Sequence, residues 1–281
     1  MTLAHSPSAA STTSRRIEAV IFDWAGTLVD FGSLAPTQIF VDAFASFGIT
    51  VTLAQARGPM GLSKREHIRQ LLAVPEIAAQ WRDKSGADAN DHDIDAIYER
   101  FMPMQIAKVG DYSQPIAGAA EVLDSLREQR IKVGSCSGYP RRVMDVLLPL
   151  AARDRIVPDH VVAGDELAAG GRPGPYMALA NVIALGIGDV RCCVKVDDTT
   201  PGIEEGRRAG MWTVGLSLSG NETGQTVEAL AALDDAARAQ CRETAATRLY
   251  DSGAHYVIDS VAHLPRALAD IARRLSEGQL P

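Results

Sequence analysis

The sequence predicts an α/β protein with a doubly wound, Rossmann-like parallel sheet and an inserted, all-helical cap domain. Two observations lead to this prediction. Short apolar runs alternate with helical patterns at residues 17–31 and again over 110–281, and such alternation is typical of right-handed βαβ units in a parallel sheet. Residues 32–109, in contrast, show helical patterns and no convincing strand.

The sheet is expected to contain six short strands. A continuous apolar run of four to eight residues bounded by turn residues is typical of a strand buried on both faces. Such runs occur at 17–22, 131–136, 160–164, 192–196, 212–217 and 255–259. Helices are expected between the strands at 118–129, 140–152, 175–186 and 202–209, and a long helical pattern at 226–248 suggests no function of its own.

The inserted segment is expected to form five helices, at 36–47, 53–57, 64–73, 76–83 and 92–107. Doubly wound folds bind ligands outside the carboxyl ends of their strands. A helical domain inserted directly after the first strand is therefore expected to cover that edge of the sheet. Residues 1–16 are small and polar, and we expect them to form a loose tail.

The composition narrows the class of protein. The chain has 281 residues, 46% of them hydrophobic, and a net charge of −7, so a nucleic-acid partner, which requires a basic surface, is not expected. Neither a membrane span nor a secretory signal is apparent. The four cysteines have the spacing of neither a zinc site nor a disulfide framework. We expect reduced thiols and a cytoplasmic location.

Polar residues follow the predicted strands at the edge that the cap would cover. Asp23 ends the first strand, Ser137 and Gly138 follow the second, and Asp197 and Asp198 end a later one. Thr27 completes the turn after Asp23, and Arg172 precedes a helix. A carboxylate nucleophile, a hydroxyl and a fixed cation together suit attack on a phosphoryl group. Mg²⁺, held by acidic oxygens, would offset the repulsion between nucleophile and substrate.

Lys64 is the candidate for a second kind of chemistry. Ser63-Lys64-Arg65-Glu66 has the form of a capping box, which predicts that a helix begins at Lys64. The helix dipole and the neighbouring Arg65 are expected to lower the pKa of the Lys64 amine, which suits imine formation with an aldehyde or ketone. His67 is expected on the same helical face.

The four strand-end stretches resemble the haloacid dehalogenase superfamily of phosphotransferases from about residue 17 to the end of the chain. The usual first motif of that superfamily is D-x-D-G-T, whose second Asp protonates the leaving oxygen. Here the motif is Asp23-Trp24-Ala25-Gly26-Thr27, so that acid is absent. Either activity has been lost, or the leaving group needs no proton from position 25.

Within the superfamily, the chain is similar to the phosphonatase family, whose signatures match "IEAVIFDWAGTLVDFG", "PMGLSKREH", "GSCSGY", "GRPGPYM" and "KVDDTTPGIEEGRRAGMWTVG". The resemblance implies hydrolysis of the C–P bond of phosphonoacetaldehyde to acetaldehyde and phosphate, in the degradation of 2-aminoethylphosphonate. It implies that Lys64 forms an imine and that Asp23 attacks phosphorus. A carbon leaving group needs no acid at position 25.

The same resemblance implies the remaining roles. Met60 and His67 would flank the imine, and His67 would assist proton transfer. Ser137, Gly138 and Arg172 would hold the phosphoryl oxygens, with Thr27 also assigned to the substrate. Asp23, the backbone carbonyl of Ala25 and Asp198 would bind Mg²⁺, and the protein would form a homodimer through the cap.

One departure from the superfamily pattern leaves the metal ligands open. The commoner form has a Gly-Asp pair followed four residues later by a second Asp, whereas this chain has Asp197, Asp198 and then Gly202. Asp198 is the expected ligand and Asp197 a supplementary acid, and the sequence does not decide which of them touches the metal.

Three other functions are compatible with parts of the sequence. A capped phosphatase or phosphomutase would act on a small phosphate ester, but it would need the acid missing at position 25. An α/β-hydrolase is suggested by Gly134-Ser135-Cys136-Ser137-Gly138, which mimics a nucleophile elbow, yet this leaves Asp23 unexplained. A non-catalytic ligand-binding relative would have little reason to keep nucleophile, lysine and arginine together.

Overall fold

A six-stranded parallel sheet forms the centre of the computed structural model, which describes residues 15–281. The strand order is β3-β2-β1-β4-β5-β6, and the predicted doubly wound fold is confirmed. The tail predicted for residues 1–16 lies, except for Arg15 and Arg16, outside the described residues. The strands are β1 (Ala19–Phe22), β2 (Lys132–Cys136), β3 (His160–Val162), β4 (Cys193–Asp197), β5 (Trp212–Leu216) and β6 (Tyr256–Ile258).

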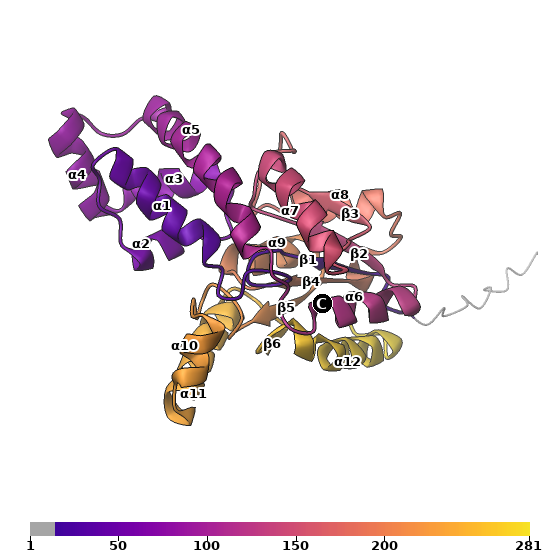
Figure 1. Ribbon diagram of the computed structural model, residues 1–281. Coiled ribbons are helices and arrows are strands. Elements are labelled where there is room, and N and C mark those ends of the chain that lie inside the picture. The colour runs from indigo at the N-terminus through magenta and orange to yellow at the C-terminus, as the bar shows by residue number, and fades with distance from the viewer. Residues whose placement is uncertain (1–14) are drawn as a thin grey trace, which may run out of the picture.

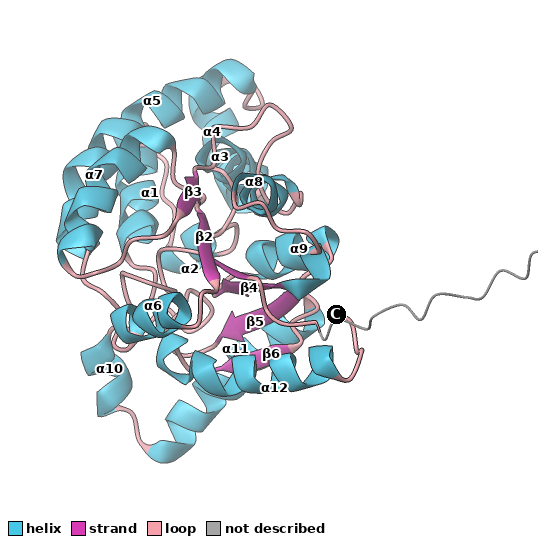
Figure 2. Cartoon of the chain, turned by 90° about the vertical axis from the view of Figure 1, so that its right-hand side faces the viewer, coloured by secondary structure: helices cyan, strands magenta, loops and turns pink. Residues whose placement is uncertain are grey.

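Helices cover both faces of the sheet, as a buried parallel sheet requires. In β1, Val20 and Phe22 belong to one apolar cluster and Ala19 and Ile21 to another, because successive side chains point to opposite faces. Figure 2 shows α6 and α7 on one side of the sheet and α8 and α9 on the other. The bounds are α6 (Ala119–Glu128), α7 (Arg141–Arg153), α8 (Tyr176–Ala184) and α9 (Thr200–Ala209).

Five helices lie between β1 and α6 in the chain and form a group beside the sheet (Figure 1). They begin and end within one or two residues of the expected bounds, at α1 (Ala35–Ser46), α2 (Leu53–Arg57), α3 (Lys64–Ala73), α4 (Pro75–Ser85) and α5 (Asp91–Lys108). Buried side chains of α1, α3 and α5 join the larger apolar cluster. That this segment acts as a cap stays a prediction.

The C-terminal third differs from the expectation in two places. The single helix expected at 226–248 is two helices, α10 (Val227–Ala232) and α11 (Asp235–Asp251), because the Asp234 side chain accepts the backbone N–H of Ala237 at 2.7 Å and caps a new helix. A last helix, α12 (Leu264–Ser276), was not predicted. Its Leu264, Leu268, Ile271 and Leu275 pack into the core at helical spacing.

The described residues also form three short 3₁₀ helices, η1 (Val109–Tyr112), η2 (Val190–Cys192) and η3 (Val261–His263). Within residues 15–281, no helix combines the length and the apolar character needed to cross a bilayer. All four cysteines are free, and Cys136, Cys192 and Cys193 are buried.

Candidate active site

The strand order brings three of the predicted polar stretches side by side. β1 lies between β2 and β4, so residues that follow these strands meet at one edge. The backbone N–H of Asp23 donates to the carbonyl of Val196 at 2.9 Å, and that of Ser137 donates to Val162 at 3.0 Å. Hydrogen bonds to neighbouring strands therefore fix the main chain at both Asp23 and Ser137.

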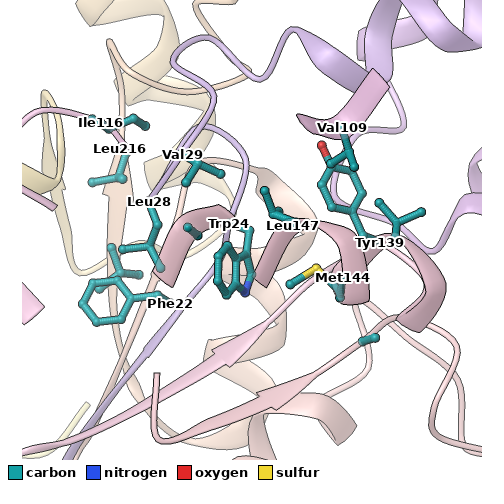
Figure 3. Packing of buried hydrophobic residues seen from close by; sticks show 14 of the residues in the cluster. Phe22, Trp24, Leu28, Val29, Val109, Ile116, Tyr139, Met144, Leu147 and Leu216 are labelled. Carbon is teal, nitrogen blue, oxygen red and sulfur yellow. The ribbon is translucent and has the colours of Figure 1, made fainter. Parts of the chain in front are cut away.

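The turn after Asp23 is shaped by Gly26 and anchored by Trp24. Gly26 has a φ of 81°, and a Cβ at this position would lie 2.1 Å from Oδ2 of Asp198, so only glycine fits. Trp24 is fully buried in the same apolar cluster as Leu28 and Met144 (Figure 3). Gly26 thus lets the turn pack closely against Asp198, and Trp24 fixes the turn to the core.

One narrow pocket at this edge collects most of the predicted site residues. It lies between the sheet edge and the helical segment, and its lining includes Asp23, Ala25, Met60, Lys64, Ser137, Gly138 and Arg172. Ser137 Oγ accepts the backbone N–H of Tyr139 at 3.0 Å, which leaves its hydroxyl hydrogen able to donate into the pocket.

Asp23 is 5% exposed and is paired with the guanidinium of Arg172, whose Nη2 lies 2.7 Å from Oδ1. Burial, reinforced by the negative charge of Asp197, raises the pKa of Asp23 to about 6. Arg172 and Lys195 oppose this rise. At neutral pH the carboxylate is thus ionised, desolvated and oriented, which is the condition a nucleophilic carboxylate needs.

Lys64 is only 4% exposed, and its Nζ lies 5.0 Å from the ring centre of Tyr139 and 5.5 Å from that of Phe40. Burial lowers the pKa of Lys64 to about 7, and the charge of Arg172 adds to this, whereas Asp23 opposes it. A substantial fraction of the amine is therefore neutral near physiological pH, as imine formation requires.

Two parts of the sequence argument for Lys64 are wrong. Helix α3 begins at Lys64, but the Ser63 side chain makes no capping hydrogen bond, and Glu66 pairs with Arg69 instead of completing a capping box. Arg65 points outward and pairs with Asp95 at 2.7 Å, so burial rather than this neighbour lowers the pKa of the amine.

His67 does not line the pocket, although it shares Phe40 as a neighbour with Lys64. Its ring is fully buried, stacks on Phe40 with centroids 3.8 Å apart, and holds Nε2 2.9 Å from the carbonyl of Ala56. Nε2 must donate to that carbonyl, which makes Nδ1 an acceptor that has no hydrogen-bond partner among the described residues. Burial and Lys64 hold the pKa of His67 well below its usual value.

The adjacent Asp197 and Asp198 have opposite surroundings. Asp197 is held by two cations and one hydroxyl, and Arg172 and Lys195 lower its pKa against the effect of burial. Burial, together with Asp23 and Asp197, raises the pKa of Asp198 well above its ordinary value. Asp198 Oδ2 accepts the backbone N–H of Asn221 at 2.8 Å, and Thr27 donates to Oδ1 at 3.4 Å. Thr27 is thus directed to Asp198 and does not line the pocket.

The site fits a divalent cation. Single oxygen atoms of Asp23, Asp197 and Asp198 all lie within 4.8 Å of one another. Among the described residues, the buried carboxylates Asp23, Asp197 and Glu205 form ion pairs with two buried cations, Arg172 and Lys195. The buried Asp198 beside them forms no ion pair within residues 15–281, so negative charge is in excess. Clustered carboxylate oxygens with an excess of negative charge are the donor set that hard cations prefer.

Comparison with known proteins identifies the family. The model of the haloacid dehalogenase-like hydrolases matches residues 17–210. The phosphonoacetaldehyde hydrolase of Salmonella newport is 58% identical over 267 residues, which cover 95% of this chain and 99% of that protein. The phosphonoacetaldehyde hydrolase of Bordetella pertussis is 56% identical over 271 residues, covering 96% and 98%. The chain belongs to the phosphonoacetaldehyde hydrolase family.

Solved structures agree with this assignment. A phosphonoacetaldehyde hydrolase-like protein from Oleispira antarctica has a TM-score of 0.94 and 46% identity, covering 99% of this chain and 100% of that one. A putative β-phosphoglucomutase from Thermotoga maritima, at 21% identity, a TM-score of 0.54 and coverage of 90% and 99%, shares the fold. As a member of this hydrolase family, the chain is an enzyme.

Sequence reasoning missed several residues that this member of the phosphonoacetaldehyde hydrolase family brings to the site. Lys195 is fully buried, with Nζ 2.7 Å from Asp197 and 3.3 Å from Glu205. Glu205 also holds Nε of Arg172 at 2.9 Å. A lone charge in the apolar run "CCVKV" was an available signal for Lys195. Phe40 and Tyr139 gave no such signal, because their approach to Lys64 depends on how the helical segment packs.

The nucleophile-elbow interpretation of residues 134–138 is not supported. Burial raises the pKa of the Cys136 thiol far above its ordinary value, so a thiolate is disfavoured. The Asn181 amide donates to Cys136 Sγ at 3.4 Å and to the Ser135 carbonyl at 3.0 Å. This stretch is held as a structural strand end that presents Ser137.

Proposed function

We propose that this protein hydrolyses the carbon–phosphorus bond of phosphonoacetaldehyde to acetaldehyde and phosphate, through an imine on Lys64 and a phosphorylated Asp23. The observation that carries the proposal is the pairing of a buried amine of lowered pKa with a buried carboxylate in one pocket. The relatives named phosphonoacetaldehyde hydrolase support the same substrate.

The first half of the reaction uses Lys64. Its neutral amine adds to the substrate aldehyde, water leaves, and a protonated imine forms that can accept an electron pair. Asp23 then attacks phosphorus, the carbon–phosphorus bond breaks, and its electrons flow into the imine to give an enamine. Because the leaving atom is carbon, this step needs no general acid at position 25, where the chain has Ala25.

The second half releases both products. The enamine takes a proton at carbon and returns to the imine, which water hydrolyses to acetaldehyde and the free Lys64 amine. Water also cleaves the aspartyl phosphate, which restores Asp23 and yields phosphate. We propose that His67 assists these transfers as a neutral hydrogen-bond acceptor, since its Nδ1 has no partner among the described residues and burial with the charge of Lys64 keeps the pKa of the ring well below its ordinary value. Met60 is proposed to shield the imine from water.

Side chains of the pocket hold the phosphoryl group. We assign its oxygens to Arg172, to the Ser137 hydroxyl and to the main chain at Gly138, all of which line the pocket. Thr27 then acts indirectly, because its hydroxyl is directed to Asp198. Mg²⁺, bound by Asp23, Asp198 and the Ala25 carbonyl, would supply charge neutralisation between the nucleophile and the phosphonate.

We also propose that α1–α5 act as a cap domain over residues 17–31 and 110–281. Lys64 and Met60 come from the helical segment and Asp23 from the sheet, so the site is complete only when both parts meet. A cytoplasmic homodimer formed through the cap belongs to the same proposal, and light scattering of the purified chain measures its mass.

The proposal is tested by product analysis. Purified protein with Mg²⁺ is expected to release acetaldehyde and phosphate from phosphonoacetaldehyde in equal amounts. Small phosphate esters serve as the matched substrates, because they share the phosphoryl group and lack the carbon leaving group. Efficient ester hydrolysis without cleavage of phosphonoacetaldehyde would instead indicate a capped phosphatase.

A further inference from the structure

The carboxylate of Asp197 occupies the space above Gly202. An ideal Cβ built on Gly202 would lie 2.0 Å from Cγ and Oδ2 of Asp197 and 2.2 Å from Oδ1. These distances are far shorter than any non-bonded contact between such atoms. Gly202 is a buried residue of the first turn of α9, and Asp197 is the last residue of β4. A side chain at position 197 or at position 202 would therefore occupy the same space in the proposed active site.

Asp197 is held there by contacts on both oxygens. Oδ1 accepts the backbone N–H of Thr199 at 3.0 Å and its hydroxyl at 2.7 Å. Oδ2 lies 2.7 Å from Nζ of Lys195 and 3.2 Å from Nη2 of Arg172, and the same Nη2 contacts Asp23. Asp197 thus links the cations of the site to the nucleophile, and a side chain at position 202 would displace it.

The residue types at positions 197 and 202 are also the reverse of those in the commoner superfamily pattern. The commoner superfamily pattern has glycine before the metal-binding Asp and a second Asp four residues after it, whereas here Asp197 and Gly202 stand in the reverse order. We propose that Asp197 and Gly202 are an exchanged pair, in which the end of β4 supplies the supplementary carboxylate that α9 would otherwise supply. Asp197 is then a positioning residue that holds Arg172 and Lys195 and favours cation binding at Asp23 and Asp198.

Reversing the exchange tests this inference. Gly202→Asp alone is expected to place two carboxylates in one space, lowering both the melting temperature and the affinity for Mg²⁺. Asp197→Gly alone is expected to weaken Mg²⁺ binding about 10- to 100-fold, as is usual when a group supporting metal ligands is removed. The double variant Asp197→Gly/Gly202→Asp is expected to bind Mg²⁺ with an affinity closer to that of the unmodified chain than to that of either single variant.

A second double variant separates charge from packing. Asp197→Gly/Gly202→Ala relieves the overlap and fills the space but supplies no carboxylate, so it is expected to regain melting temperature without regaining Mg²⁺ affinity. Calorimetric titration with Mg²⁺ alone and melting in metal-free buffer give both readouts independently of catalysis. Equal Mg²⁺ affinity in the two double variants, or unimpaired Mg²⁺ affinity and melting temperature in Gly202→Asp, would overturn the inference.

Two further measurements keep the inference testable if the glycine variants do not fold, and separate it from the proposed function. Asp197→Asn keeps the shape of the side chain and is expected to stay folded with weakened Mg²⁺ binding and a lower kcat; unchanged values for both would contradict the proposal even if the glycine variants failed to fold. The inference rests on the proposed function for the catalytic role of the site. Turnover of phosphonoacetaldehyde by the unmodified chain tests that function separately, since Mg²⁺ affinity does not depend on the substrate.

Discussion

Lys64 shows how burial, aided by the charge of Arg172, lowers the pKa of an amine towards neutrality. The side chain is almost entirely removed from water, with aromatic rings of Phe40 and Tyr139 beside its Nζ. Loss of hydration disfavours the ammonium form and lowers the pKa of Lys64, and the negative charge of the nearby Asp23 offsets only part of this decrease. The buried amine is therefore expected to lower the stability of the folded chain, as is common where a position is kept for function.

Replacing Lys64 by arginine is expected to abolish cleavage of the carbon–phosphorus bond although the positive charge is kept. A guanidinium cannot form the imine, and removal of one member of a covalent catalytic unit lowers kcat by about 10³-fold or more. Phosphate release under saturating phosphonoacetaldehyde measures the effect. Lys84→Arg is the control, because Lys84 is exposed on α4. Near-normal turnover by Lys64→Arg would show that the amine is not used.

The lowered pKa of Lys64 predicts a dependence of both rate and stability on pH. The neutral amine increases as pH rises through about 7, so imine formation should accelerate over that range. Because the folded pKa lies below the value of 10.5 in the unfolded chain, the unfolded chain binds more protons between these limits. The destabilising effect of Lys64 is complete below pH 7 and shrinks as pH rises towards 10.5.

Lys64→Met is accordingly expected to raise the free energy of unfolding at pH 7 by on the order of 1 kcal/mol. The advantage of the variant should decrease at higher pH. Urea denaturation of both proteins at pH 7 and pH 9 measures it. A variant that is less stable than the unmodified chain at pH 7, or an advantage that grows with pH, would contradict the lowered pKa.

At the scale of elements, the half-buried side chain of Arg57 links α2 to two loops, one before α1 and one after β5. Arg57 ends α2 and donates to the carbonyl of Gly32 at 3.0 Å and to that of Gly224 at 3.1 Å. It also reaches the side chain of Asn221 at 3.4 Å, whose backbone N–H holds Asp198. Arg57 thus joins the helical segment to the loop whose backbone holds Asp198.

Arg57→Ala is expected to lower kcat/KM about tenfold or more, because each lost charge-assisted hydrogen bond costs about 1.5–3 kcal/mol. Hydrogen exchange should also increase in residues 217–226, where the loop loses its partner. Arg65→Ala is the matched control on the same helical segment, because its exposed pair with Asp95 contributes little. Equal effects of the two substitutions would show that Arg57 is an ordinary surface contact.

At the scale of the whole molecule, the proposed active site lies where the sheet edge meets the helical segment and where buried negative charge is in excess. The sheet edge supplies Asp23, Asp197 and Asp198, and the helical segment supplies Lys64 and Met60. The three aspartates approach one another in the interior of a chain that is itself acidic, with a net charge of −7. Such an arrangement is more favourable with a bound cation than without one.

Removal of divalent metal with a chelator is therefore expected to stop turnover and to lower the melting temperature. A cation that binds only the folded chain stabilises it by about 2.7 kcal/mol at a concentration 100 times its dissociation constant. Thermal melting with and without Mg²⁺ measures the shift, and K⁺ at equal ionic strength is the control. Full activity in the presence of chelator would contradict a role for the cation.

Much of this architecture follows from local sequence, and the rest depends on packing. The strands and the helices of 32–109 were predictable because apolar spacing is a local property, and strand order then brought Asp23, Ser137 and Asp197 together. The cause of the lowered pKa of Lys64 was not predictable. Burial against Phe40 and Tyr139 depends on contacts between segments far apart in the chain, as does the overlap of Asp197 with Gly202.

The central claim is that Lys64 forms an imine with the substrate, and trapping that imine tests it most directly. Protein mixed with phosphonoacetaldehyde and borohydride should become irreversibly inactive, and peptide mass analysis should place one reduced adduct on Lys64. Borohydride without substrate is the control and should leave activity intact. Sustained turnover of phosphonoacetaldehyde with no adduct on Lys64 would contradict the account.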